Sequence, residues 1–302
     1  MKQIIKEIVG FFLFQINRFL GAKNDHILSV YFHNPSRKVF KDVVSHLRIN
    51  GFKIISLNDL EIRISKKSID QKLAIITLDD GWLGNLELID LVEKYEAPIT
   101  IFVSIDSAIS GNYWFEYASI QGQEKLTNVA SVEEFKRLLP DEIADKVAIL
   151  KNAYKLNRSC MSVADIQRLA SNPLVGIGSH TVTHPILDRC SSEQKRVELA
   201  DAKSTITNWI SNSVKHFAYP NGDYDQNTID IAKECGYTLA FTNVPGKIDV
   251  HSVNPYLIPR NGIEDDGGYY ENISKATGVW QRFLPKKVHK MKRLENNKLI
   301  SL

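Results

Sequence analysis

Short apolar runs alternate with amphipathic segments through most of the chain. Runs of strand length lie at residues 27–32, 53–56, 73–78, 99–103, 175–177, 214–218 and 239–242. Segments with helical spacing of apolar residues lie between them, at 39–50, 86–95, 162–170, 192–208 and 227–235. Near-continuous apolar strands that alternate with helices are typical of a mostly parallel sheet covered on both faces. About seven strands of this kind favour an α/β fold whose sheet curls toward a barrel.

One connection is much longer than the others. Residues 107–160 separate the apolar run at 99–103 from the one at 175–177. A structureless loop of this length is rare in a compact domain, so the segment is predicted to be an insertion with its own structure. Helical spacing at 132–139 and 142–154 indicates a helical insertion.

The first 24 residues form a separate amphipathic segment. At helical spacing, one face carries Ile5, Ile8, Phe12, Ile16 and Phe19. Two interpretations stay open: this face packs on the core of the protein, which we favour, or it lies on a membrane surface. The segment is too short and too interrupted for a transmembrane span and lacks a clear signal-peptide cleavage site, which predicts a cytoplasmic protein.

The other end of the chain is basic. Residues 271–302 are predicted to be a tail, and no acidic residue lies between positions 282 and 293, where six lysines and arginines fall. Such a run either contacts anionic lipid or is simply solvated. Residues 25–270 then form the main domain.

Composition adds mainly exclusions. Of 302 residues, 43% are hydrophobic and 24% charged, which excludes a disordered chain. The net charge of +3 gives no reason to expect a nucleic-acid partner. Three widely spaced cysteines without a CxxC pair, Cys160, Cys190 and Cys235, predict free, buried thiols.

Polar residues recur where the predicted strands end, which is where active sites collect in parallel α/β folds. Asp79 and Asp80 follow the run at 73–78, and His180 and His184 follow the run at 175–177. His33 follows the run at 27–32.

The spacing of the two histidines suits a metal ion. On one helical turn, residues four apart present both imidazoles on the same side. Two histidines and one aspartate are typical of a catalytic metal site with open positions for water and substrate. The plain alternatives are a structural histidine pair and an Asp-Asp-Gly turn or helix cap.

Three segments together resemble the motifs of the NodB-homology polysaccharide deacetylases, carbohydrate esterase family 4. TLDDG at 77–81 matches the first motif, SHTVTHP at 179–185 matches the second, and FAYPNG at 217–222 is a variant of the third. The resemblance extends from about residue 26 to 265. It implies a distorted (β/α) barrel of about seven strands and one divalent metal ion, usually Zn²⁺; Co²⁺, Ni²⁺ and Mn²⁺ also suit this ligand set.

The resemblance also implies roles for single residues. The implied metal ligands are Asp80, His180 and His184. Asp79 is the implied general base, which takes a proton from a water whose pKa the metal lowers. The implied substrate contacts of the third motif are Tyr219, Pro220 and Asn221, and the backbone N–H of Asn221 would stabilise the oxyanion.

The chain departs from the family pattern at several positions. The arginine that orients the base is replaced by Ala218, and Arg260 is our candidate substitute; its alternative is an ordinary surface arginine. The late histidine that serves as general acid is not recognisable. A subgroup of biofilm-type deacetylases takes this histidine from an early strand end, which SVYFH at 29–33 resembles, so His33 is the predicted general acid. Its alternative is a histidine that caps the strand.

The insertion carries an aromatic cluster at residues 113–117. We name Trp114 as a candidate sugar contact, with core packing of the insertion as the alternative.

These inferences predict a metal-dependent hydrolase that removes N-acetyl groups from an amino sugar in a bacterial surface polysaccharide or in its lipid-linked precursor. Two alternatives remain: an esterase that removes O-acetyl groups, and a catalytically inactive, glycan-binding barrel. The expected partners are the glycan or lipid-linked sugar and the surface of an anionic membrane.

Overall fold

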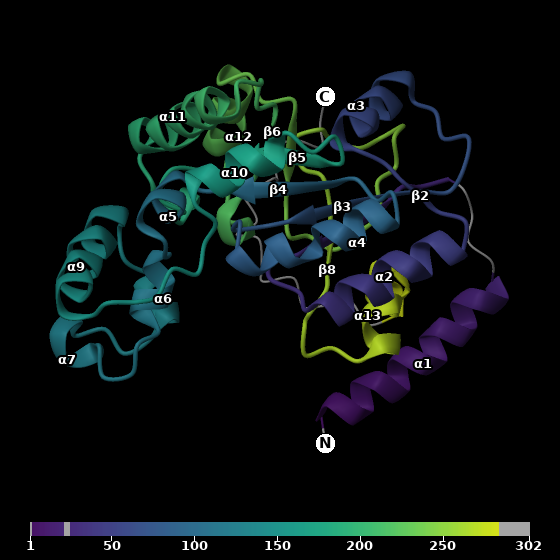
Figure 1. Ribbon diagram of the computed structural model, residues 1–302, viewed down its shortest axis with the longest axis horizontal. Coiled ribbons are helices and arrows are strands. Elements are labelled where there is room, and N and C mark those ends of the chain that lie inside the picture. Colours follow the sequence, from purple (N-terminus) through teal and green to yellow (C-terminus); the bar gives the residue numbers. More distant parts are fainter. Residues whose placement is uncertain (1, 21–24, 284–302) are drawn as a thin grey trace, which may run out of the picture.

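A computed structural model describes residues 2–20 and 25–283 of the chain (Figure 1). Within these residues the strands are β1 (Leu28–Phe32), β2 (Lys53–Ile54), β3 (Leu73–Leu78), β4 (Ile99–Val103), β5 (Val175–Ser179), β6 (His216–Ala218), β7 (Leu239–Phe241) and β8 (Asn261–Gly262). The strands pair in the order β7-β6-β5-β4-β3-β1-β8, and β2 pairs with β3 outside this path. All of these pairings are parallel.

Helices surround this sheet. They are α1 (Lys2–Leu20), α2 (Arg37–Ile49), α3 (Leu57–Lys66), α4 (Ile89–Lys94), α5 (Ile105–Ser110), α6 (Trp114–Ala118), α7 (Glu124–Thr127), α8 (Val132–Phe135), α9 (Pro140–Ala153), α10 (Val163–Ala170), α11 (Ser192–Ile210), α12 (Gln226–Glu234), α13 (Tyr269–Ala276) and α14 (Val279–Phe283). Short 3₁₀ turns cover Leu83–Leu88, Leu187–Arg189 and Pro220–Gly222. Several helices begin at side-chain caps, as at Ser36 and Ser162, whose hydroxyls accept backbone N–H bonds.

The segment that leads into β8 closes the curled sheet. Ile258 forms a parallel bridge with Phe241 in β7, and Asn261 pairs with Val30 in β1. One stretch of chain therefore connects the two sides of the sheet, and the predicted distorted (β/α) barrel of mostly parallel strands is confirmed. The dipeptide Asn261–Gly262 escapes prediction because its two residues carry no apolar pattern.

Side chains of β3 alternate between two hydrophobic clusters. Leu73 and Ile75 pack with residues of other strands, among them Phe102 and Phe241, inside the barrel. Ala74, Ile76 and Leu78 belong to the cluster that includes the covering helices. Because strand side chains alternate with a period of two, the positions after Ile75 on the inner side are 77 and 79. The barrel thus presents Asp79 at the inner rim of its carboxyl end.

The insertion has a core of its own. Helices α6 to α9 pack around a cluster that includes Phe135, Val147 and Leu150. These helices project from the barrel on the left of Figure 1. The insertion returns to the barrel at Cys160, which bridges to Trp82 directly after the Asp-Asp-Gly turn.

Helix α1 packs on the molecule through a different face from the one that its apolar spacing suggests. Gly10 and Leu13 are buried, and α1 contacts α13. The sequence pattern favours core packing of the face that carries Ile5, Ile8, Phe12 and Ile16, and that interpretation is wrong: these four side chains are exposed. The side chain of Phe19 lies outside the described residues. The pattern misleads because Glu7 and Gly10, which periodicity counts as the solvent side, make close contacts with α13 alongside Leu13 and Phe14.

The first part of the predicted tail is structured, since residues 271–276 and 279–283 belong to α13 and α14. Residues 284–302 lie outside the described residues. No helix within residues 2–20 and 25–283 has the length and the apolar run needed to cross a membrane. Among the cysteines, Cys160 and Cys190 are buried, Cys235 is half-buried, and all three are free.

Candidate active site

The turn after β3 sets two adjacent carboxylates at different angles. The backbone N–H of Asp79 donates to the carbonyl of Phe32 at 2.8 Å, which extends the β1–β3 pairing by one residue. Asp80 then adopts a left-handed conformation with φ of 72°, and Gly81 follows with φ of 60°. A Cβ atom at Gly81 would lie 2.8 Å from Val103 Cγ1, so this position requires glycine. Left-handed backbone at a non-glycine residue is uncommon and concentrates at functional sites.

The second motif is an irregular loop, not the helical turn that the histidine spacing suggests. β5 ends at Ser179, and Thr181 and His184 have φ of 70° and 58°. The loop is held from within, because the backbone N–H of His184 donates to Thr181 Oγ1 at 3.1 Å. It is also held from the residue that follows β4, because the Ser104 hydroxyl donates to the carbonyl of His180 at 2.6 Å. Two residues in left-handed conformation therefore bring the two imidazoles together, which one helical turn was predicted to do.

Asp80, His180 and His184 converge although β4 separates the strands from which they come. The Asp80 Oδ1 atom lies 3.4 Å from Nε2 of each histidine, and all three side chains are buried. His180 Nδ1 lies 2.8 Å from the carbonyl of Ala218, so this nitrogen carries the hydrogen and Nε2 keeps its lone pair. The Trp82 indole donates to the other oxygen of Asp80 at 3.0 Å.

This arrangement fits a divalent cation. Asp80 Oδ1 is buried and has no hydrogen-bond partner, although two imidazole nitrogens face it. The ligand atoms of the three residues lie within 4.8 Å of one another. Burial raises the pKa of the Asp80 carboxyl, but the two imidazoles outweigh this effect and bring its pKa well below the usual value. An ionised carboxylate and two imidazoles form a set that Zn²⁺ binds, with positions left for water and substrate.

Arg260 pairs with the second carboxylate. Its Nη1 and Nη2 atoms donate to Asp79 Oδ1 and Oδ2, both at 2.7 Å, and the arginine is 0% exposed. Burial raises the pKa of the Asp79 carboxyl, but Arg260 outweighs this effect and brings its pKa below the usual value. The alternative of a surface arginine is therefore wrong.

The guanidinium of Arg260 is also fixed by its other contacts. It donates to Thr77 Oγ1, to the carbonyl of Thr242 and to Asn243 Oδ1, each at 3.0 Å. Its central carbon lies 4.4 Å above the centroid of the Tyr31 ring, a cation–π contact. All five N–H groups of the guanidinium thus have an acceptor, and one of its faces lies on the Tyr31 ring.

The two carboxylates open into a cleft of about 500 Å³. His33 and Asn221 also line this cleft, as do His180 and His184. Asn221 adopts a left-handed conformation with φ of 56°, and its buried side-chain nitrogen has no partner.

The other predicted contacts lie elsewhere. Tyr219 is fully buried and its hydroxyl donates to the carbonyl of Tyr256 at 3.1 Å, while Pro220 is buried as the first residue of the 3₁₀ turn. Trp114 is buried in the core of the insertion, and its indole donates to the carbonyl of His184 at 2.9 Å. None of these three side chains lines the cleft of the carboxylates.

The polysaccharide deacetylase family model matches residues 66–240 of the chain, which include both carboxylates and both histidines. The chain belongs to the polysaccharide deacetylase family. One curated relative, YxkH of Bacillus subtilis (strain 168), is named as a polysaccharide deacetylase. It is 23% identical over 212 residues, which are 70% of this chain and 59% of YxkH, so the chain spans about three fifths of that relative.

Several solved structures share the fold of this chain. IcaB from Ammonifex degensii aligns with a TM-score of 0.59 and 18% identity, covering 84% of this chain and 98% of IcaB. The Streptococcus pyogenes deacetylase PplD, solved in complex with acetate, aligns with a TM-score of 0.55 and 17% identity, covering 85% of this chain and 99% of PplD. At this level of identity the likeness concerns the fold.

Sequence reasoning missed several residues of the deacetylase-family cleft. Trp82, Lys136 and Asn243 line it, as does Phe115, which belongs to the predicted aromatic cluster at 113–117 but was not singled out. Phe115 and Lys136 come from the insertion. The insertion therefore forms one wall of the cleft, but through Phe115 and not through its neighbour Trp114. Trp82 had an available signal, because it follows the Asp-Asp-Gly turn directly. Asn243 had none, since it follows β7 in a segment without a motif.

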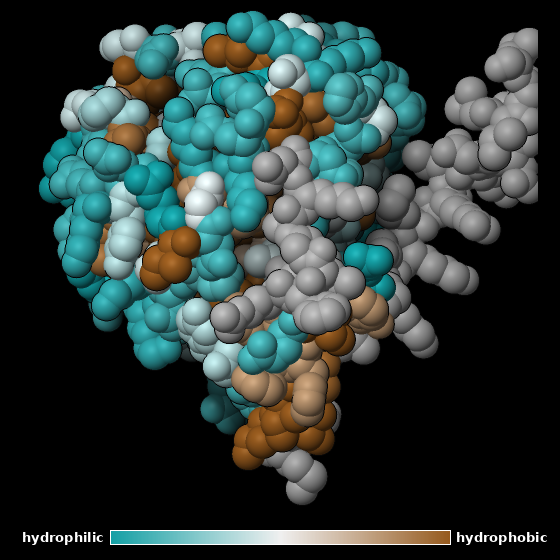
Figure 2. All heavy atoms as spheres, turned by 90° about the vertical axis from the view of Figure 1, so that its right-hand side faces the viewer, coloured by the Kyte–Doolittle hydropathy of each residue, from teal (hydrophilic) through white to brown (hydrophobic). Residues whose placement is uncertain are grey.

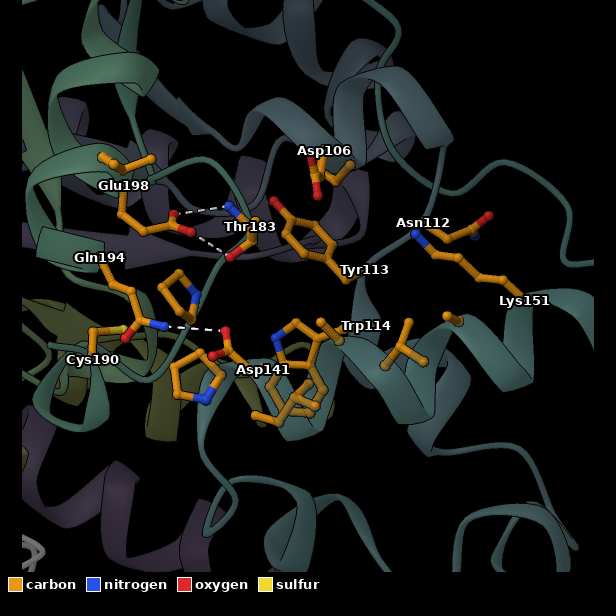
Figure 3. A pocket seen from close by; sticks show the side chains of 18 of the residues that line it. Asp106, Asn112, Tyr113, Trp114, Asp141, Lys151, Thr183, Cys190, Gln194 and Glu198 are labelled. Atoms are coloured by element: carbon orange, nitrogen blue, oxygen red, sulfur yellow. Dashed lines mark hydrogen bonds between the residues drawn. The ribbon is translucent and has the colours of Figure 1, made fainter.

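Glu198 of α11 supports the histidine loop from behind, and Figure 3 shows it beside a second cavity of about 420 Å³. One of its carboxylate oxygens accepts the backbone N–H groups of Val182 and Thr183 at 2.8 and 3.0 Å. The other accepts the Thr183 hydroxyl at 2.6 Å. The carboxylate is buried, which raises its pKa. Glu198 thus fixes the two residues that precede His184.

Proposed function

We propose that this chain is a metal-dependent hydrolase that removes N-acetyl groups from an amino sugar in a bacterial surface polysaccharide or its lipid-linked precursor. The observation that carries the proposal is the pairing of a three-residue cation site with a separate carboxylate that Arg260 holds ionised. Family membership supports the deacetylase chemistry. A bound Zn²⁺ would lower the pKa of a water and polarise the acetyl carbonyl.

The chain's own residues divide the remaining work. Asp80, His180 and His184 would hold the metal. Asp79 accepts the proton of the attacking water, because it is not engaged by the histidines and its carboxylate remains ionised beside Arg260. Arg260 orients this carboxylate through a bidentate contact, which fixes the plane of the acceptor oxygens.

Two further residues serve the leaving group and the oxyanion. His33, exposed at the end of β1 on the wall of the same cleft, gives a proton to the departing amine. Asn221 lines the cleft in a left-handed turn, and its backbone N–H stabilises the oxyanion. Trp82 and Phe115 offer aromatic surfaces beside the carboxylates on which a sugar ring can stack.

Measurement of acetate release tests the proposal. We expect zinc-loaded protein to release acetate from N-acetylglucosamine oligomers or from a lipid-linked N-acetylhexosamine. Asp79→Asn should retain the metal, measured by elemental analysis, and lose activity by about 10²–10⁴-fold, the usual contribution of a general base. Asp90→Asn, which alters an exposed carboxylate paired with Arg37, is the matched control and should retain activity.

Three results would contradict the proposal. Release of acetate from O-acetylated xylan but from no amide would make the protein an esterase. Binding of glycan without any turnover by the fully metal-loaded protein would make it a glycan-binding barrel. An Asp79→Asn variant as active as wild type would remove the proposed base.

A further inference from the structure

Helix α1 is held on the molecule by one face. A Cβ atom at Gly10 would lie 2.5 Å from the backbone nitrogen of Glu271, so the helices touch at their backbones. The Ser274 hydroxyl donates to the carbonyl of Gly10 at 2.9 Å. Glu7 accepts the backbone N–H groups of Tyr270 and Glu271 at 3.0 and 3.1 Å, at the start of α13. These contacts fix which side of α1 faces outward.

The outward side is an apolar surface, which we call the α1 face. Its residues are Ile4, Ile5, Ile8, Phe11, Phe12 and Ile16, each between 38% and 66% exposed. At 3.6 residues per turn the centre of this surface lies opposite Gly10. Figure 2 shows this surface as a brown projection at the bottom of the molecule. The other large exposed apolar residues of the described chain are distributed over many elements, so this concentration demands an explanation.

The sequence that follows α14 is rich in positive charge. Within α1 itself, Lys6 is half exposed and lies 3.4 Å from Glu271, on the side of the helix that faces α13. Helix α14 contacts α1 and ends at Phe283. The sequence after Phe283 has five cations at positions 286–293 and its first acidic residue at Glu295. A second copy of the chain would bring two such basic segments together, whereas an anionic surface would attract them.

We propose that the α1 face docks on the surface of a membrane that contains anionic lipid, with α1 parallel to the membrane plane. The apolar side chains enter the boundary between headgroups and acyl chains, and the positive charge of the sequence at 286–293 adds electrostatic attraction to anionic headgroups. Figure 1 shows α1 along the lower right edge and the insertion helices α6, α7 and α9 at the far left. Docking through α1 therefore leaves the cleft, which the insertion borders, open.

Co-sedimentation of the full chain with vesicles tests this proposal. Phosphatidylcholine vesicles containing phosphatidylglycerol should bind the protein, and vesicles of phosphatidylcholine alone should bind it less. Raising the salt from about 0.05 M to about 0.5 M should weaken the binding, because exposed charges are screened. The pair Ile8→Gln and Phe12→Gln should lower the partition coefficient at least about tenfold, since two apolar side chains no longer leave water. Glutamine is a good helix former, so α1 should persist.

The matched control replaces two apolar residues of similar exposure on other helices. Ile62→Gln on α3 and Ile149→Gln on α9 replace side chains that are 48% and 46% exposed, and this variant should bind vesicles like wild type. Equal loss in both variants would overturn the proposal, as would vesicle binding insensitive to the α1 substitutions. The proposal would also be overturned if sedimentation velocity showed a wild-type dimer that the α1 substitutions dissociate, and if wild type did not bind vesicles. Acetate release from a soluble oligomer, measured on the same variants, reports separately on the proposed function.

Discussion

Replacement of Arg260 by methionine tests how the buried ion pair supports both folding and chemistry. Methionine keeps much of the side-chain volume but leaves the Asp79 carboxylate buried, 2% exposed, without its guanidinium partner. Removal of one partner from a buried pair costs roughly 3–5 kcal/mol. Hydrogen bonds to Thr77, Thr242 and Asn243 are lost at the same time. We therefore expect Arg260→Met to lower the free energy of unfolding by about 3–5 kcal/mol.

Urea unfolding measures this loss, and a double-mutant cycle assigns it to the pair. Addition of Asp79→Asn to Arg260→Met should recover part of the lost stability, because a neutral amide replaces the uncompensated charge. Arg63→Met is the matched control: Arg63 pairs with Asp70 at 3.0 Å on the surface, and its loss should cost no more than about 1 kcal/mol.

Activity gives the second measurement. Arg260→Lys retains a positive charge but not the bidentate contact, so it should lower kcat/KM by about 10²-fold, the usual cost of a misplaced catalytic group. Additive effects of Arg260→Met and Asp79→Asn on stability, or full activity of Arg260→Lys, would refute the reasoning.

Two other predictions concern supporting residues. Glu198→Ala should weaken Zn²⁺ binding about 10–100-fold in a chelator competition, whereas Glu198→Gln should retain most of the wild-type affinity. An amide oxygen can accept the two backbone N–H groups, and the Thr183 hydroxyl can turn to accept from the amide NH₂. Equal Zn²⁺ affinities of the alanine variant and wild type would contradict this role of Glu198. Burial raises the pKa of Glu271, but Lys275 and Lys6 outweigh it, so the net pKa is lowered. The ionised Glu271 carboxylate therefore stabilises the folded state. This contribution is fully present above the ordinary glutamate pKa of about 4.3 and is lost as the pH falls through the lowered pKa of the folded protein. Wild type should therefore lose stability more steeply than Glu271→Gln below about pH 5, measured by circular dichroism, and parallel curves would contradict the prediction.

The strands and the two principal motifs could be predicted from the sequence because their signals are local. Residues 73–78 form a buried strand because five apolar side chains and one threonine leave no alternation of apolar and polar faces, and the observed β3 has the predicted bounds. The placement of Asp79 and His180 at one end of the sheet follows from parallel strand order alone. Resemblance to the family then connected these positions with a cation site.

Other features depend on contacts that the sequence does not encode locally. Arg260 reaches Asp79 from 181 positions away, through a segment that closes the barrel, so no spacing rule could distinguish it from a surface arginine. Glu198 lies on a helix whose pattern describes only which face is apolar, not which loop lies beneath it.

Helix α1 shows most clearly which features the local sequence determines and which depend on tertiary contacts. Its sequence determined that a helix with one apolar face would form, because periodicity is a property of neighbouring residues. Which face would be buried was decided by α13, whose backbone approaches Gly10 closely enough that only a glycine fits. Local pattern therefore fixed the elements and their chemistry, whereas pairings across the fold decided which charges are neutralised and which apolar surface remains exposed.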